Sequence, residues 1–279
     1  LLSTSGMENH PLTPMTDSDL RKWLAPQSRY TIGHVAVQSV FAGADEISAA
    51  LDAQHVAGHR HIVVDAIRDE DLFEIGKAAK NLPLITGGSG IALGLPANFG
   101  CTAGDVAWSA QSGKTIALSG SCSTATRAQV QAHAKINPTR EITAAQVLEG
   151  TLRAQDIAEW LLCEDGIPLA FSSADPDTVK HAQARFGREA CSHALEAFFA
   201  EVARKVLAGG ATKIITAGGE TSGAIIEGLG LNKLEIGPEI DPGVPALRAG
   251  ENLVVALKSG NFGATDFFEK AAKIMTGDT

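Results

Sequence analysis

The chain has 279 residues, of which 44% are hydrophobic and 20% charged, and its formal net charge is −9 at pH 7. This composition is ordinary for a globular protein of one or two domains. An acidic chain without a long basic run is a poor partner for nucleic acid or an anionic membrane surface. The sequence contains no apolar run of about 18 residues, the length that would predict a transmembrane helix.

Strand and helix patterns alternate through the first part of the chain. They predict strands at 35–40, 61–65 and 82–85, with helices at 44–57 and 69–80 between them. The run HIVVD at 61–65 is short and β-branched, which is typical of a buried strand in a parallel sheet. This alternation predicts βαβ units.

Residues 96–113 have a weaker pattern that includes Gly, Asn, Ser and Gln, and we place a domain boundary there. The alternation then returns, with predicted strands at 115–119, 169–172, 213–216 and 253–257 and predicted helices at 124–134, 144–162 with a break at Gly150, and 193–208. The sequence therefore predicts an α/β fold of two α/β domains with mainly parallel sheets, the first domain incomplete.

Three strands of the second half run into turns rich in Gly and Ser. The segments are IALSGSCSTAT, IITAGGETSGA and VALKSGNFGATDF. Glycine lets the backbone approach a ligand closely, and the N–H groups at a helix start attract anions. Parallel strands bring such turns to one edge of a sheet, where ligands usually bind. A phosphate or nucleotide site and ordinary turn chemistry both fit these residues.

Two nucleotide-binding motifs are approximated but not met. Gly113-Lys114-Thr115 resembles the end of a P-loop, but Trp108 stands where the first glycine belongs, and the motif precedes a strand. We therefore interpret Lys114 as a solvated loop lysine. The glycines at 88, 90 and 94 approximate a dinucleotide fingerprint with the last one place late. A nicotinamide-dependent oxidoreductase would need the correct spacing and a later acidic residue, and we do not find that pair.

The four cysteines, Cys101, Cys122, Cys163 and Cys191, form no CxxC pair that would suggest zinc. So few cysteines fit a reducing cytoplasm. Cys122 stands at a predicted helix start, where a thiolate would be favoured. Because no histidine base is identifiable for it, we interpret it as a small buried residue of the turn. His10, in MENHPLTPM, is interpreted as part of a domain-edge loop, with a substrate contact as the alternative.

Several long motifs resemble the four-carbon acid sugar kinase family. AGGETSGAI (217–225), IGPEIDPGVP (236–245) and LKSGNFGATDFF (257–268) are similar to its C-terminal signature. MENHPLTPM (7–15), ITGGSGIALGL (85–95) and LSGSCSTATRAQV (118–130) also match its pattern, so the resemblance covers essentially the whole chain. Within the family, the chain is most similar to the members that phosphorylate 3-oxo-tetronate.

The resemblance implies a sugar-acid-binding domain followed by an ATP-binding domain. Family members open with an Asp-Asp-Phe-Thr-Gly motif that this sequence lacks, so we expect the chain to be the last two thirds of a family protein. Residues 1–110 would be the remainder of the substrate domain, and residues 111–279 the nucleotide domain. The implied reaction transfers the ATP γ-phosphoryl group to the terminal hydroxyl of a 3-oxo-tetronate, threonate or erythronate. A non-catalytic nucleotide or sugar-acid binding module is the alternative.

The turns and the resemblance together indicate the site residues. Substrate contacts are expected at Gly87, Gly88 and Ser89. Nucleotide contacts are expected at Ser119, Ser121, Gly218, Gly219, Glu220, Thr221, Ser222, Gly223, Ser259, Gly260, Asn261 and Gly263. We expect Mg²⁺ to be held mainly by ATP. Because Gly219 and Gly260 are expected on surface turns, alanine there should obstruct the phosphates more than the fold.

Asp241 is the candidate catalytic base, because Pro242 restricts it to extended conformations within a fixed turn. A carboxylate that bonds only its own turn backbone is the alternative. We expect a cytoplasmic enzyme whose partner is a small sugar acid, and we leave a homodimer open. The stereochemistry of the substrate does not follow from the sequence, nor does activity without the missing segment.

Overall fold

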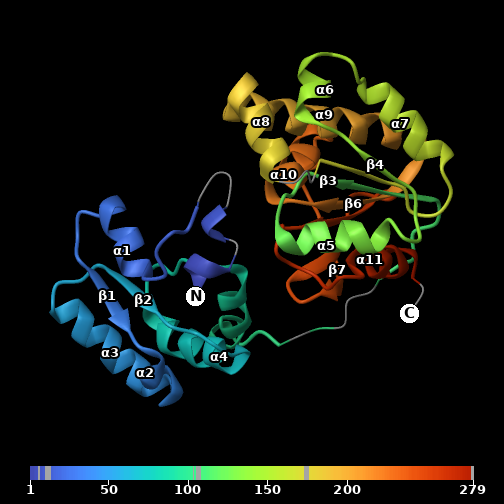
Figure 1. The fold of residues 1–279 in the computed structure, drawn as a ribbon. Helices are drawn as coiled ribbons and strands as arrows, with labels where there is room; N and C mark the ends of the chain where they lie inside the picture. Colours follow the sequence, from blue (N-terminus) through green and yellow to red (C-terminus); the bar gives the residue numbers. More distant parts are fainter. Residues whose placement is uncertain (6, 10–13, 103, 105–107, 173–175, 278–279) are drawn as a thin grey trace. The chain divides into compact units, whose positions relative to one another are not determined.

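The computed structural model describes residues 1–5, 7–9, 14–102, 104, 108–172 and 176–277. The chain divides into two compact units, Leu1–Asp105 and Val106–Thr279 (Figure 1). The described residues form a two-stranded sheet in the first unit and a seven-stranded sheet in the second. Each unit is described by itself below.

The first unit is built on two parallel strands that pack against three helices. Its elements are α1 (Leu20–Leu24), β1 (Ile32–Val35), α2 (Val37–Phe41), α3 (Ala44–Val56), β2 (His61–Val64) and α4 (Asp69–Ala78), with 3₁₀ turns at Leu2–Thr4, Met7–Asn9, Ala25–Gln27, Ala79–Asn81, Ser89–Gly94 and Pro96–Phe99. The apolar side chains of Val35, Val40, Ile47, Leu51 and Ile75 form its core. The predicted strand at 61–65 and the two predicted helices of this unit are confirmed.

Two predicted strands of this unit are wrong. The strand predicted at 35–40 ends at Val35, and α2 begins at Val37. There the backbone N–H of Val37 donates to Asp65 Oδ2 at 3.2 Å, and a carboxylate at a helix start stabilises the first turn. Residues 82–85 pair with no strand among the described residues, and Leu84 is 80% exposed. Its apolar side chain therefore does not mark a buried strand.

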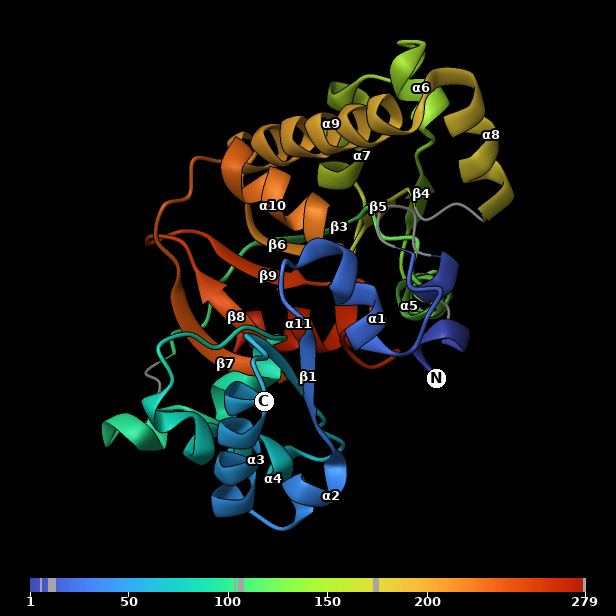
Figure 2. The same cartoon turned by 90° about the vertical axis from the view of Figure 1, so that its left-hand side faces the viewer.

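The second unit is a sheet of order β4-β5-β3-β6-β9-β8-β7 (Figure 2). Its elements are β3 (Lys114–Ser119), α5 (Thr124–His133), β4 (Thr139–Glu141), α6 (Ala144–Leu148), α7 (Ala154–Cys163), β5 (Leu169–Phe171), α8 (Pro176–Phe186), α9 (Arg188–Ala208), β6 (Ala211–Ala217), α10 (Gly219–Gly228), β7 (Glu235–Asp241), β8 (Val244–Arg248), β9 (Val254–Lys258) and α11 (Phe267–Thr276). The first five strands in this order run parallel: β4, β5, β3, β6 and β9. Strands β8 and β7 add an antiparallel hairpin at the other edge.

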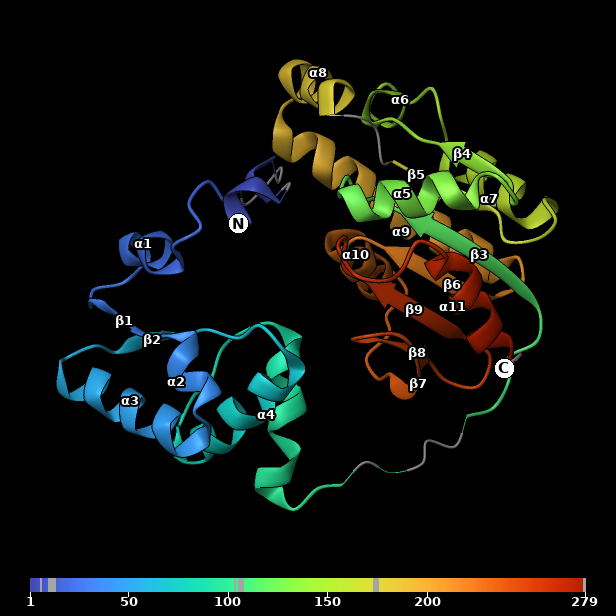
Figure 3. The same cartoon turned by 60° about the horizontal axis from the view of Figure 1, so that its bottom comes forward.

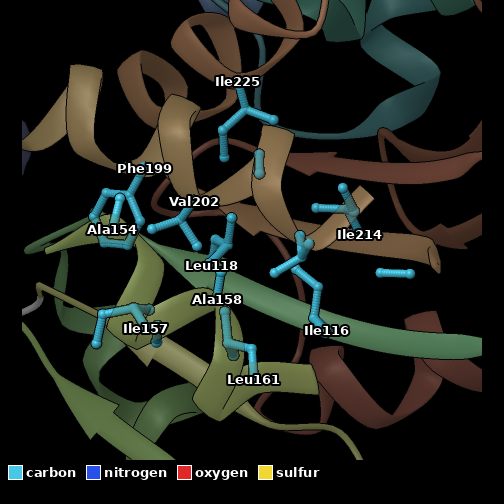
Figure 4. Packing of buried hydrophobic residues seen from close by; sticks show 14 of the residues in the cluster. Ile116, Leu118, Ala154, Ile157, Ala158, Leu161, Phe199, Val202, Ile214 and Ile225 are labelled. Carbon is cyan, nitrogen blue, oxygen red and sulfur yellow. The ribbon is translucent and has the colours of Figure 1, made fainter. Parts of the chain in front are cut away.

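Helices cover both faces of this sheet. Helices α6 to α10 lie over one face, and α5 and α11 lie over the other (Figures 1 and 3). Successive side chains of β3 alternate between these faces. Ile116 and Leu118 pack with Phe199 on the first face (Figure 4), whereas Ala117 packs with Phe268 on the second. Burial on both faces explains why three consecutive residues in the middle of the strand, 116–118, are apolar.

The prediction of an α/β fold with mainly parallel sheets is confirmed. The four predicted strands of the second half are present, and the helix predicted at 193–208 begins earlier, at Arg188. The β7–β8 hairpin was not predicted, because Pro238, Pro242 and Pro245 break the pattern expected of a strand. No helix in the described part of the chain is long and apolar enough to cross a membrane.

Substitution of Gly76 tests the packing of the first unit. A Cβ atom on Gly76 would overlap the backbone of Gly94, which lies against α4. Gly76→Ala should therefore lower the free energy of unfolding by about 1–3 kcal/mol, a typical overpacking cost. Gly88→Ala is the control, because nothing lies within 4 Å of its Cβ position. Equal unfolding midpoints of the two variants in urea would contradict this packing.

Candidate functional site

Three loops follow the central strands of the second sheet. The first loop (Gly120–Ser123) follows β3, the second loop (Gly218–Thr221, with the start of α10) follows β6, and the third loop (Ser259–Ala264) follows β9. Because β3, β6 and β9 are parallel neighbours, their carboxyl ends lie together. Helices α5 and α10 leave this edge on opposite faces (Figure 3). Such a divergence opens the crevice in which α/β sheets usually bind ligands.

Glycines allow these loops to touch one another. A Cβ atom on Gly120 would overlap the hydroxyl of Thr221 in the second loop. Gly218 has a φ of +121°, and its Cβ position lies 3.2 Å from the backbone nitrogen of Ser121. The Cβ position of Gly260 lies 2.5 Å from Ser121 Oγ. The first loop is therefore in contact with both other loops.

The side chain of Lys258 ends β9 directly beneath the third loop and is completely buried. Its Nζ donates to Thr126 Oγ1 at 2.9 Å and to the carbonyl oxygens of Ser259 and Gly260, each at 3.2 Å. The ammonium also lies 5.6 Å from the centre of the Phe267 ring. The carbonyl oxygen of Lys258 accepts the backbone N–H of Gly218 at 2.8 Å. Lys258 therefore joins the second and third loops to the sheet.

Burial lowers the pKa of Lys258 to about 8. Desolvation disfavours a charged group unless an opposite charge compensates for it, and in the described part of the chain Lys258 forms no ion pair with a carboxylate. Its partners are neutral oxygens. The site therefore contains a buried amine, and no carboxylate among the described residues neutralises its positive charge.

The carbonyl oxygen of Gly260 receives two further hydrogen bonds from α5 and its cap. Ser123 Oγ donates to it at 2.6 Å, and Thr126 Oγ1 donates at 2.7 Å. Ser123 Oγ also accepts the backbone N–H of Thr126 at 3.1 Å and so caps α5. Because the peptide is trans and planar, a carbonyl held toward Lys258 directs the N–H of Asn261 the opposite way.

The rest of the third loop is held by Gln129, whose side chain is 1% exposed. Its Nε2 lies within 2.9–3.0 Å of the carbonyl oxygens of Phe262, Gly263 and Ala264. Two N–H groups shared among three carbonyls pin the backbone without using the loop's own N–H groups. Helix α5 thus orders the third loop along most of its length.

Several of the predicted nucleotide contacts come together here. Ser121, Gly218, Thr221 and Gly260 are in mutual contact through the first loop, and Ser119 is buried at the end of β3. The predicted contacts that are exposed at this edge are Gly219, Glu220, Gly223, Ser259 and Asn261.

Ser222 faces inward, unlike the exposed members of the set. Thr216 Oγ1 donates to the carbonyl oxygen of Ala256 at 3.1 Å, so Ser222 Oγ must donate to Thr216 Oγ1, at 2.7 Å. Gly263 has a φ of +83°, and its Cβ position lies 3.2 Å from Asp241 Oδ2. Ser222 therefore bonds α10 to β6, and Gly263 allows the third loop to lie against Asp241.

Asp241 lies at the far end of the third loop and is 5% exposed. Its Oδ2 accepts the backbone N–H of Ala264 at 2.8 Å, and its Oδ1 accepts Lys270 Nζ at 2.7 Å. The turn that follows is instead closed by Glu239, whose Oε1 accepts the N–H of Gly243 at 2.7 Å. The alternative in which Asp241 bonds only its own turn is therefore wrong.

The predicted substrate contacts Gly87, Gly88 and Ser89 lie in the first unit and are exposed. They precede and begin the 3₁₀ turn Ser89–Gly94. His10 and residues 11–13 of the MENHPLTPM motif lie outside the described residues.

Three further expectations are resolved by the structure. Lys114 is not a solvated loop lysine, because it begins β3 and its ammonium donates to the carbonyl oxygen of Glu164. Burial raises the pKa of Cys122, which agrees with a structural thiol in the turn. Gly260 is not on an open turn, since it faces Ser121 and Ser123, whereas the space around Gly219 is open as expected.

Lys258, Ser123, Thr126 and Gln129 were not predicted as site residues. A lysine at the end of the apolar run LVVAL is the signal that could have identified Lys258. The spacing of Ser123, Thr126 and Gln129 by three residues, on one face of α5, is the second signal. Among the described residues, no group of three or more His, Cys, Asp or Glu could hold a metal ion.

Comparison with known proteins relates both units to one family. Residues 116–268 match the family described as a nucleotide-binding C-terminal domain, and residues 1–95 match the family described as a sugar-binding N-terminal domain. A 3-oxo-tetronate kinase of Brucella melitensis is 39% identical over 98% of this chain and 65% of its own length. A 3-oxo-tetronate kinase of Pseudomonas savastanoi pv. phaseolicola is 41% identical over 99% of this chain and 66% of its own length.

A crystal structure from Salmonella typhimurium LT2 has a TM-score of 0.75 at 38% identity, and covers 98% of this chain and 67% of that one. The chain spans 65% and 66% of the length of the two curated relatives above.

Alanine substitutions in the second loop separate turn geometry from ligand contact. Gly218→Ala forces a side chain into a left-handed conformation and should cost about 1 kcal/mol or more of stability. Gly219→Ala adds a methyl group in open space and should leave the unfolding midpoint unchanged, but it should weaken nucleotide binding if phosphates approach the start of α10. Calorimetry with ADP and urea unfolding measure the two effects. Unchanged ADP affinity in Gly219→Ala would remove this glycine from the site.

The pH dependence of stability reports the buried charge of Lys258. Its pKa is about 8 in the folded chain against an ordinary value of 10.5, so between these pH values the unfolded chain holds the extra proton and stability should rise with pH. The full gain is on the order of 3 kcal/mol. Above pH 9 the raised pKa values of Cys122 and Cys191 act in the opposite sense. The measurement is therefore urea unfolding of the wild type and of Lys258→Met at several pH values. Equal slopes of the unfolding free energy against pH in the two proteins would contradict a lowered pKa of Lys258.

Proposed function

This chain belongs to the four-carbon acid sugar kinase family, and on that premise we propose that it forms the greater part of an ATP-dependent kinase. We assign ATP binding to residues 111–279, which make up most of the second unit, and a contribution to sugar-acid binding to residues 1–110, which include the first unit. The γ-phosphoryl group passes to the terminal hydroxyl of a four-carbon acid of the 3-oxo-tetronate, threonate or erythronate type.

The observation that supports this proposal most is the convergence of three glycine-containing loops above one buried ammonium group. A nucleotide carries several negative charges on its phosphates, and such groups are bound by N–H donors, hydroxyls and fixed positive charge. The first loop supplies Ser121, the second supplies the start of α10, and the third supplies the N–H of Asn261, which faces away from Lys258. All three features favour a polyphosphate ligand.

Phosphoryl transfer needs positioning and charge stabilisation more than covalent chemistry by the protein. A bound Mg²⁺ would neutralise charge on the phosphates. The loops offer hydroxyls, peptide groups and the exposed carboxylate of Glu220, a donor set that suits an ion held mainly by ATP and water. Glu220 is the residue of this set that would contact the ion or its water.

Asp241 remains our candidate for the group that orients or deprotonates the substrate hydroxyl. Its place beside Gly263 and Ala264 supports a position near the third loop. The ion pair with Lys270 fixes the orientation of the carboxylate. The same two bonds would also serve to hold the end of the third loop, and the experiment below separates the roles.

The alternative function is a nucleotide or sugar-acid binding module without turnover. A cytoplasmic location is proposed from the four free cysteines, and a homodimer stays open. The substrate contacts Gly87, Gly88 and Ser89 are proposed from the family resemblance and from their exposure at one turn of the first unit.

Turnover with four-carbon sugar acids tests the proposal directly. ADP release should be measured for the 279-residue chain and for the protein extended to the full length of its relatives, with 3-oxo-tetronate, threonate and erythronate as acceptors. Acceptor-dependent ADP release in the extended protein is the expected result. ADP binding without release by any acceptor would favour the binding module, and the absence of ADP binding would contradict the nucleotide site.

Paired substitutions test the role of Asp241. If it is the base, Asp241→Asn should lower kcat by about 10²–10⁴-fold with little change in the KM for ATP, and Lys270→Met should have a much smaller effect. If Asp241 only holds the third loop, both variants should raise the KM for ATP and lower the unfolding midpoint together. The measurements are steady-state kinetics and thermal unfolding of both variants, and the second pattern would contradict a base.

A further inference from the structure

We infer that Lys258 is a positioning residue for the nucleotide: its buried ammonium group is the counter-charge of the phosphates and holds the third loop in its binding form through Gly260. This inference rests on the proposed function and extends it, because it assigns the source of charge at the site. It also predicts that nucleotide binding takes up a proton, which a purely structural lysine would not cause.

The position of Lys258 supports this assignment. It is the last residue of β9, at the carboxyl edge where the three loops meet, and it is completely buried. Its ammonium bonds Thr126 from α5 and the carbonyl of Gly260 from the third loop. Any movement of the third loop must therefore break bonds to a charged donor, which are stronger than bonds between neutral groups.

The charges around Lys258 indicate that a ligand supplies its counter-charge. Helix α5 presents the hydroxyl of Thr126 to it, and α11 presents the ring of Phe267. Three acidic side chains at α11 and the end of β7 have other partners: Asp241 and Asp266 pair with Lys270, and Glu269 pairs with His133. A buried cation without a carboxylate is costly, and the phosphates of a nucleotide at this edge would compensate for it.

The same sheet provides a matched control. Lys213 of β6 is also buried, with 3% of its surface exposed. Its Nζ donates to the carbonyl oxygen of Gln111 at 2.8 Å and to Thr276 Oγ1 at 2.9 Å. It lies near the amino end of β6, whereas Lys258 ends the parallel neighbour β9. Loss of either lysine removes a buried charge, but only Lys258 is placed at the proposed phosphate site.

Proton uptake on ADP binding tests the inference on the wild-type chain. Calorimetry at pH 8 in two buffers of different ionisation enthalpy gives the number of protons taken up, and at this pH the phosphates of ADP are already ionised. Burial places the pKa of Lys258 near this pH, and a neighbouring anion raises it. We expect an uptake of about half a proton per ADP, and no uptake between pH 7 and 9.5 would overturn the inference.

Variants distinguish positioning from folding. Lys258→Met should weaken ADP binding by about 10–100-fold and abolish the uptake. Lys258→Arg should recover part of the affinity without uptake, because arginine does not titrate in this range. Lys213→Met should retain both the affinity and the uptake.

Wild-type affinity in Lys258→Met would overturn the inference and leave the proposed function intact. A wild-type chain that binds no ADP would overturn both. If Lys258→Met fails to fold, the proton uptake of the wild type and the Lys258→Arg variant still decide the question.

Discussion

The carbonyl oxygen of Gly260 organises the candidate site, because it accepts hydrogen bonds from three side chains. The ammonium of Lys258 approaches from β9, the hydroxyl of Ser123 from the first loop, and the hydroxyl of Thr126 from α5. Each donor is fixed by another bond: Ser123 caps α5, and Thr126 Oγ1 accepts from Lys258. A network in which every member is bonded is rigid. A nucleotide would therefore meet loops that are already in place, which reduces the ordering cost of binding.

The order of strands explains why these residues meet. Residues 119, 217 and 258 are far apart in the sequence, but β3, β6 and β9 are adjacent and parallel, so their ends lie at one edge. The apolar cores on the two faces fix this arrangement (Figure 4). The glycines at 120, 218 and 260 then permit contact between the loops. The packing of the sheet thus brings the three loops together, and the residues at the strand ends provide the chemical groups of the site.

Much of this was predictable from local pattern. Strands such as 115–119 and 213–216 are short apolar runs bounded by turns, and the three Gly/Ser turns follow them directly. The apolar run before Lys258 could have marked it as a site residue, but its burial and its bonds to Thr126 and Gly260 depend on long-range packing that no local pattern reveals. Residues 82–85 have the pattern of a strand but no partner strand in the described part of the chain. The difference between Gly219 and Gly260 likewise depends on contacts with a loop more than a hundred residues away.

A crystal structure of the chain with bound ADP would decide whether the three loops hold the phosphates. We expect phosphate oxygens within hydrogen-bonding distance of the first, second and third loops, with Lys258 beneath them. Phosphates bound elsewhere would contradict this expectation, for example in the hollow of about 520 Å³ lined by Leu152, Phe198 and Lys205. So would a third loop whose Gly260 carbonyl has left Lys258 when ADP is bound.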